Sequence, residues 1–135
     1  MNNLTNKDVV AGFFEIYNHK DYQAMYRYFV PNYYDHSLPQ VRSIEDAIAI
    51  LKQTHASFPD LQVQIDDLIE EDNKVVFRGR FTGTHLGEFS GLSPSGLPVE
   101  FEALEIFKLE NQKITESWGY WPMTDIIRQI NEHLI

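Results

Sequence analysis

The period of the hydrophobic pattern changes near residue 60, and this change limits the possible folds more than any other feature of the chain. Before that point, apolar residues recur every three to four positions, as they do on one face of a helix. After it, Leu61, Val63 and Ile65 alternate with polar residues, which is typical of a strand that buries one face. Because the helical and strand patterns are segregated along the chain, we predict an α+β fold.

Three helices are expected in the first part of the chain. Thr5 can cap the first, and Ser43 can cap the third, which ends before Phe58-Pro59-Asp60. A short helix between them is ended by Pro31, because proline has no N–H and fits poorly inside a helix. The segment from Asn32 to Pro39 is expected to be irregular or a short strand.

Four strands are expected after the helices, at residues 61–66, 75–82, 99–107 and 113–121. A long segment, Gly83 to Pro98, joins the second to the third, and loops of that length in a compact domain are usually functional or mobile. Pro122 can begin a terminal helix with an apolar face that extends to Leu134. These elements predict one domain, residues 1–135, in which a cone-shaped, curved antiparallel sheet packs on three N-terminal helices and a C-terminal helix follows.

Charge and residue content exclude several classes of protein. The 135 residues include 11 Lys and Arg against 20 Asp and Glu, so the formal net charge of −9 disfavours nucleic acid and anionic membranes as partners. No apolar run approaches the roughly 18–20 residues that span a bilayer. The absence of cysteine excludes disulfides, thiol nucleophiles and cysteine-ligated metals. Together with a polar N-terminus, these features predict a cytoplasmic protein.

Aromatic side chains are abundant: nine Phe, seven Tyr and two Trp make up 13% of the chain. Tyrosine combines an apolar ring with a polar hydroxyl, which suits a pocket that binds a hydrophobic molecule and also holds a few polar groups. The same rings can equally fill a hydrophobic core. Both interpretations stay open, since both require buried aromatic residues.

Four stretches of the sequence are distinctive: Tyr34-Asp35-His36, residues 83–89, residues 94–101 and residues 113–118. With the helical N-terminal third, they resemble the SnoaL-like polyketide cyclase and ester cyclase family of the nuclear transport factor two-like superfamily. The resemblance covers nearly the whole chain. It implies a cone-shaped α+β fold and a cyclase, isomerase or hydrolase activity on a hydrophobic, polyketide-like or ester-like substrate. We also expect a homodimer through the outer sheet face, because the sheet has more apolar positions than one helix layer can cover, and the resemblance points the same way.

The resemblance also implies where the reactive groups should lie. In the polyketide cyclases, an aspartate on the last strand and a histidine on the preceding strand handle protons; these positions fall at Gly119 and near Glu105. Glycine cannot move a proton, so either the chemistry has changed or the chain is a non-catalytic binder of a hydrophobic molecule. The limonene-epoxide-hydrolase branch needs an Arg two residues before an Asp on one strand. The nearest candidate is Arg78, but position 80 is Arg, so this branch is disfavoured. For the ketosteroid-isomerase branch, nothing in the spacing identifies its tyrosine, acid and aspartate.

His36 and Glu105 are the candidate catalytic residues. Histidine exchanges protons near neutral pH, and His36 follows a pair of tyrosines that could form aromatic walls around it. Glu105 lies in an otherwise apolar segment, where desolvation would raise the pKa of its carboxyl group. We expect the two to lie within reach of each other in the cavity. Alternatively, His36 is a solvent-facing loop residue, and Glu105 faces outward to pair with Arg78 or Arg80.

Six further residues are expected to contact the ligand: Tyr17, Tyr34, Phe77, His85, Ser117 and Trp121. Ser117 and Trp121 share a strand face with Gly119, and His85 lies in the long loop where it could line the mouth of the cavity. No histidine spacing suited to a metal and no phosphate-binding glycine loop is present, so we expect neither a metal nor a cofactor.

Overall fold

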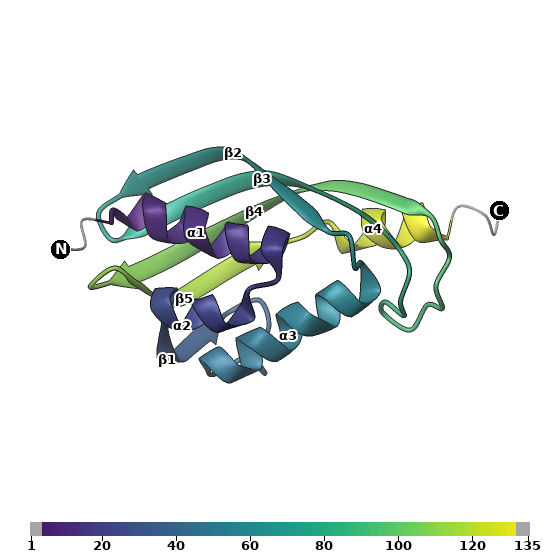
Figure 1. Cartoon of the computed structure of the whole chain (residues 1–135). Coiled ribbons are helices and arrows are strands. Elements are labelled where there is room, and N and C mark those ends of the chain that lie inside the picture. Colours follow the sequence, from purple (N-terminus) through teal and green to yellow (C-terminus); the bar gives the residue numbers. More distant parts are fainter. Residues whose placement is uncertain (1–3, 132–135) are drawn as a thin grey trace.

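The computed structural model describes residues 4–131 and confirms the α+β fold (Figure 1). In chain order the elements are α1 (Asn6–His19), a 3-10 turn (Tyr22–Ala24), α2 (Met25–Tyr28), β1 (Phe29–Asp35), α3 (Ile44–Ser57), β2 (Gln62–Glu71), β3 (Lys74–Thr84), β4 (Pro98–Glu110), β5 (Lys113–Tyr120) and α4 (Met123–Ile130). The change of period near residue 60 therefore marks the boundary between the helical part and the long strands. Leu134, placed on the terminal helix by the sequence, lies outside the described residues.

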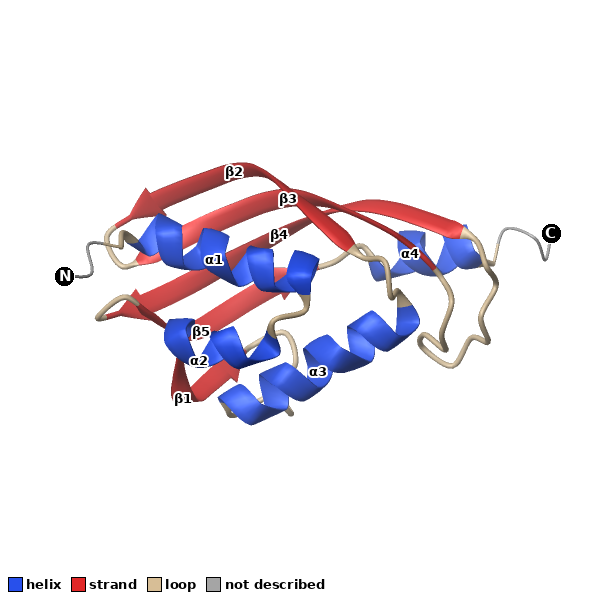
Figure 2. Ribbon diagram, viewed as in Figure 1, coloured by secondary structure: helices blue, strands red, loops and turns tan. Residues whose placement is uncertain are grey.

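The strands form one curved sheet in the order β1-β5-β4-β3-β2 (Figure 2). The three pairings among β2, β3, β4 and β5 are antiparallel, as predicted, but β1 pairs with β5 in parallel, so the sheet is mixed. The second helix ends at Tyr28, before the predicted stop at Pro31, and Phe29 begins β1. Pro31 lies inside this strand, where the pairing register shifts; an edge strand tolerates proline because one of its sides has no partner.

Helices α1, α2 and α3 lie on one side of the sheet, as Figure 2 shows. Helix α1 begins at a capping box in which Thr5 and Asp8 satisfy each other's backbone N–H groups. Its buried face carries Val9, Val10, Phe13, Phe14 and Ile16. Helix α4 packs beside β4, where the side chain of Gln129 bonds the backbone N–H and C=O of Glu100.

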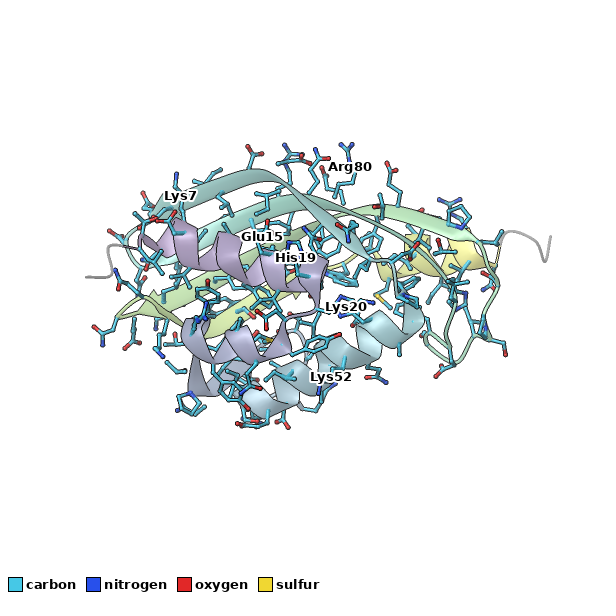
Figure 3. The ribbon with its side chains drawn as sticks, in the orientation of Figure 1. Lys7, Glu15, His19, Lys20, Lys52 and Arg80 are labelled. Carbon is cyan, nitrogen blue, oxygen red and sulfur yellow. The ribbon has the colours of Figure 1, made fainter. Side chains whose placement is uncertain are left out.

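Alternation along β4 determines which side chains face the helices. Every second residue from Val99 to Leu109 is buried, whereas the residues between them are exposed or half-buried. Arg80 of the adjacent strand projects from the outer face of the sheet, away from the helices (Figure 3). Glu105 is the one charged residue in the buried series of β4, so the backbone geometry carries its carboxyl group to the inside.

No helix in the described part of the chain is long and apolar enough to cross a membrane.

Candidate functional site

A cavity of about 760 Å³ opens between the inner face of the sheet and the helices. Its walls come from α1, β1, α3, the loop that follows β3, and the paired strands β4 and β5. The side chains that matter most for chemistry are Tyr17, Tyr33, Asp35, Ser37, Glu105 and Trp121. Within the described residues, no Lys, Arg or His lines this cavity.

Glu105 is the buried acid of the cavity. The residue is only 9% exposed, and the indole N–H of Trp121 donates a hydrogen bond to its Oε2 over 3.4 Å. Burial raises the pKa of the Glu105 carboxyl group from 4.5 to about 8; the Trp121 hydrogen bond opposes this rise, and the negative charge of Asp35 adds to it. At pH 7 the group is therefore protonated and can donate a hydrogen bond or a proton.

Gly119 provides the space that Glu105 occupies. The two residues are direct partners in the β4–β5 ladder, so their side chains would share the inner face of the sheet. A Cβ atom at position 119 would lie 3.6 Å from Glu105 Cγ and 3.3 Å from Ser37 Oγ. A methyl group at position 119 would therefore be in ordinary contact with Glu105, and a longer side chain there would compete with the Glu105 carboxyl group for the same space.

Asp35 is a second carboxyl group on the cavity wall. It ends β1, pairs with Ser117 of β5 and is half-buried. One of its oxygens, Oδ1, accepts hydrogen bonds from the backbone N–H and the hydroxyl of Ser37, over 2.9 and 2.8 Å. The Ser37 hydroxyl oxygen in turn accepts the backbone N–H of Gly119, which fixes this turn against β5.

Two tyrosine hydroxyl groups complete the polar part of the cavity. Tyr33 is hydrogen-bonded to the hydroxyl of Ser117, and Tyr17 projects from α1. Burial raises the pKa of both phenols above the ordinary value, and the Glu105 charge raises them further. Because both phenols keep their protons, the Tyr17 hydroxyl can act only as a neutral donor or acceptor toward a ligand.

Three of the residues predicted from the sequence meet at the cavity: Glu105, Tyr17 and Trp121 all line it. Ser117 faces the same side of β5 but lies behind Tyr33, to which it is hydrogen-bonded. The ring of Trp121 is held against Phe81, with centroids 4.9 Å apart.

The predicted contact between His36 and Glu105 is not formed. The His36 ring stacks on Trp118 with centroids 4.4 Å apart, and its Nε2 lies 2.8 Å from a carboxylate oxygen of Glu116. Trp118 alternates with Ser117 and Gly119 along β5, so it and His36 lie on the outer face of the sheet. His36 is not among the cavity-lining residues, and its acidic partner is Glu116.

The other three predicted ligand contacts also lie away from the cavity lining. Tyr34 packs edge-on against His36, with Arg42 above its ring. Phe77 is fully buried and stacks on Phe14 with centroids 3.8 Å apart, so it belongs to the core. His85 is also fully buried.

His85 is buried beneath the long loop after β3 and accepts a hydrogen bond from it. The backbone N–H of Ser95 donates to His85 Nδ1 over 3.1 Å, whereas Nε2 has no partner among the described residues. The cavity wall is formed instead by the neighbouring loop residues Glu88, Phe89 and Ser90. The loop therefore borders the cavity, but through residues other than His85.

Sequence reasoning missed Asp35, Tyr33 and Ser37. A usable signal exists, because Tyr33 and Asp35 are two residues apart and point inward together once the segment is taken as a strand. Pro31 obscures this strand in the sequence, because proline is uncommon inside strands, and the tripeptide Tyr34-Asp35-His36 predicts His36 rather than Asp35 as the proton-exchanging group.

The sequence profile that describes the SnoaL-like polyketide cyclases matches residues 7–130. The chain belongs to the SnoaL-like polyketide cyclase family. Membership, together with the fold, supports a small-molecule-binding protein of the nuclear transport factor two-like type. Among curated proteins, none matches the chain significantly.

Several solved structures share the whole fold. TsrD from Streptomyces laurentii is 25% identical, with a TM-score of 0.88 over 96% of this chain and 97% of that protein. A protein from Jannaschia sp. CCS1 that is described as a SnoaL-like polyketide cyclase is 26% identical, with a TM-score of 0.85 over 93% of this chain and 90% of that one. IdmH from Streptomyces antibioticus is 24% identical, with a TM-score of 0.84 over 95% and 99%, and this likeness concerns the fold alone.

Within residues 4–131 of this SnoaL-like chain, no three His, Asp or Glu side chains are grouped as metal ligands would be.

Proposed function

We propose that this SnoaL-like protein binds a hydrophobic, polyketide-like or ester-like molecule in the cavity and acts on it by general acid/base chemistry. The observation that carries the proposal is the Glu105 carboxyl group, buried in an aromatic cavity with a pKa of about 8. A carboxyl group with a pKa close to the working pH is suited to giving and taking a proton during turnover.

The cavity suits such a ligand in size and in lining. Its volume of about 760 Å³ lies within the range of sites for organic molecules of moderate size. Rings of Phe13, Phe29 and Trp121 supply flat apolar surface, and Tyr17 supplies a polar contact. We propose that Tyr17 and Trp121 contact the ligand directly.

The position of the acid, on β4 at residue 105 and not on β5 at residue 119, supports a catalytic role for Glu105. The family resemblance implies a histidine near position 105 and an aspartate at position 119. Here an acid stands on β4 and a glycine on β5, and the two are ladder partners. The acid is thus present on the neighbouring strand, above the site that the aspartate side chain would use.

Replacement of Glu105 by Gln tests the proposal. Glutamine keeps the size of the side chain and removes the transferable proton, so turnover of aromatic polyketone and ester substrates should fall by about 10²–10⁴-fold. The matched control is Glu100→Gln, since Glu100 lies on the exposed face of the same strand. Unchanged turnover in Glu105→Gln, with Glu100→Gln also unchanged, would contradict the catalytic proposal.

A second candidate is a non-catalytic binder, and the specific observation in its favour is Gly119. If the aspartate was lost together with the activity, Glu105→Gln should change ligand affinity only modestly and should stabilise the protein. Isothermal titration calorimetry with an aromatic polyketone measures the ligand affinity of the wild type and of Glu105→Gln. Comparison of these affinities with the turnover rates separates the two candidates.

We also propose that the protein forms a homodimer through the outer face of the sheet. Leu104 and Tyr120 are ladder partners on this face and are 46% and 65% exposed. Adjacent exposed apolar side chains of this kind often mark an interface. Light scattering at micromolar concentration should give twice the 15.8 kDa mass of the chain, and a monomer mass would refute this proposal.

A further inference from the structure

The long segment between β3 and β4 is firmly anchored along its first arm. The backbone N–H groups of Leu86 and Gly87 both donate to the carbonyl oxygen of Ser57, the last residue of α3, over 3.0 and 3.1 Å. A Cβ atom at Gly87 would lie 1.9 Å from the carbonyl oxygen of Ala56, so the backbone runs directly against the helix. Figure 1 shows the segment beside this end of α3. The first arm is therefore fixed to the helix.

The second arm is anchored by His85. Its backbone N–H donates to the carbonyl oxygen of Leu97 over 2.9 Å, and its own carbonyl oxygen accepts the N–H of Gly96 over 2.8 Å. Its ring Nδ1 accepts the backbone N–H of Ser95 over 3.1 Å. Because His85 is fully buried, water does not compete for the bond to its ring. Residues 95–97 are therefore held in place beside the end of β3.

Residues 88–94, which we call the tip segment, are held to the rest of the protein much more lightly. In the described part of the chain, one hydrogen bond and one ring contact join the tip segment to the other elements. The Ser57 hydroxyl donates to the carbonyl oxygen of Glu88 over 2.6 Å. The ring of Phe89 packs on Phe58 with centroids 5.0 Å apart. Both contacts are made at the C-terminal end of α3, on one side of the tip segment.

The other hydrogen bonds of the tip segment are internal. Phe89 and Leu92 exchange two backbone hydrogen bonds, over 3.0 and 2.9 Å, and the N–H of Gly91 donates to the carboxylate of Glu88. Phe89 and Leu92 are half-buried against the hydrophobic core. A Cβ atom at Gly91 would meet no atom within 4 Å apart from the adjacent residues, so this turn stands clear of the rest of the molecule. The tip segment can therefore move as one unit without the loss of its own bonds.

The tip segment also forms part of the mouth of the cavity. Glu88, Phe89 and Ser90 belong to the cavity wall. Glu88 and Ser90 are exposed and Phe89 is half-buried, so this part of the wall lies where the cavity meets solvent. Loops at the mouth of such cavities open and close around organic ligands in many enzymes. A movement of the tip segment would change the width of the mouth.

We infer that the tip segment is a gate to the cavity and that the hydroxyl of Ser57 is its latch. A ligand enters and leaves when the bond from Ser57 to Glu88 breaks and the tip segment swings away from α3 between its two anchored arms. This inference rests on the proposed binding of a hydrophobic molecule in the cavity, and it adds how access to the cavity is controlled.

The contacts that open set the size of the expected effect. Opening breaks one neutral hydrogen bond and separates one ring contact, while the bonds of both arms stay intact. Movements of this kind occur on the microsecond to millisecond timescale. Replacement of Ser57 by Ala removes the latch and leaves the exposed Glu88 carbonyl oxygen to water. The ratio of open to latched molecules should then rise by about 2–10-fold, which corresponds to the net contribution of one hydrogen bond.

NMR relaxation dispersion of the backbone amides tests the gate without a ligand. The wild type should show exchange at residues 88–93 and flat profiles at 86–87 and 95–97, and Ser57→Ala should increase the exchange contribution in the tip segment. The matched control is Ser93→Ala, because the Ser93 hydroxyl belongs to the same segment and has no hydrogen-bond partner among residues 4–131. This control should equal the wild type.

Two results of this measurement would overturn the inference. Flat profiles at residues 88–93 in both the wild type and Ser57→Ala would mean that the tip segment does not open. Exchange of equal size throughout residues 86–97 would mean that the whole loop loosens, with no fixed arms on either side of a gate.

Stopped-flow fluorescence with Prodan, an uncharged aromatic dye whose emission shifts when it leaves water, connects the gate to the cavity. With the protein in excess over the dye, Ser57→Ala should raise the association and dissociation rate constants together by about 2–10-fold and leave the Kd within about twofold. The reason is that the latch holds the closed state both with and without a ligand. Ser93→Ala should leave both rate constants unchanged.

A different division of the effect would contradict the gate. If Ser57→Ala raises the dissociation rate constant and the Kd but leaves the association rate constant unchanged, Ser57 is only a contact in the cavity wall. Equal rate constants in the two proteins would also overturn the inference. The relaxation measurement needs no ligand, so it decides the gate even if the proposed function fails, and the turnover of Glu105→Gln decides the proposed function even if no gate exists.

Discussion

The stability of this protein should depend on pH in a way that Glu105 dominates. The Glu105 carboxyl group has a pKa of about 8 in the folded protein, against an ordinary value of 4.5 that applies to the unfolded chain. Between these values the folded state binds a proton that the unfolded state has released. The contribution of Glu105 to the free energy of unfolding is therefore largest below pH 4.5, and it is lost as the pH rises through about 8.

The size of the effect follows from the two pKa values. Each pH unit between them corresponds to about 1.4 kcal/mol, so the whole interval from 4.5 to about 8 corresponds to about 5 kcal/mol. This is an upper bound, because an ionised carboxylate would draw water into the cavity and so reduce the cost of its burial. Glu105→Gln removes the titration, so the variant should equal the wild type near pH 5 and be several kcal/mol more stable near pH 9.

Urea unfolding of both proteins at unit pH steps from 5 to 9 measures this difference. Subtraction of the two curves cancels the titration of all other groups, and Glu100→Gln controls for the loss of one negative charge from the same strand. A difference between wild type and Glu105→Gln that stays constant across this range would refute the reasoning, because it would mean that Glu105 is ionised in the folded protein throughout.

Other substitutions test separate parts of the structure. Trp121→Phe removes the indole donor that opposes the rise in the Glu105 pKa, so a ¹³C NMR titration of Glu105 should show a higher pKa; a lower one would contradict the assigned contact. His36→Ala should leave ligand affinity unchanged and cost at most about 1 kcal/mol in urea unfolding, because its hydrogen bond to Glu116 is partly exposed; a large loss of affinity would instead place His36 at the site. Gly87→Ala should cost about 1–3 kcal/mol in the same assay, because the new Cβ would lie 1.9 Å from the carbonyl oxygen of Ala56, and a neutral result would show that the loop yields freely.

The sequence was sufficient for most of the fold because each long element repeats its own period. The alternation along β3 and β4 is continuous over many residues, and α1 and α3 carry both a cap and an apolar face. For the segment that forms β1, the sequence left an irregular segment and a short strand as alternatives. The strand is short, contains Pro31 and pairs with residues more than eighty positions later. A pairing that distant leaves no local pattern.

The site was only partly predictable for the same reason. Glu105 was identifiable as a lone carboxyl group in an alternating apolar strand, and the structure places it in the cavity. His36 and Asp35 are neighbours, and which of them faces inward depends on the register of β1 against β5. Because successive residues of a strand point to opposite faces, an unassigned register leaves that choice open.

The two outer strands of the sheet have a consequence for how copies of the chain meet one another. Strand β1 has a proline at its edge, which removes a donor that a further strand would need. Strand β2 carries Asp66, Asp67, Glu70 and Glu71 and a bulge after Ile65. A second copy aligned along β2 would set carboxylates against carboxylates, so the sheet ends at both sides and does not template filaments.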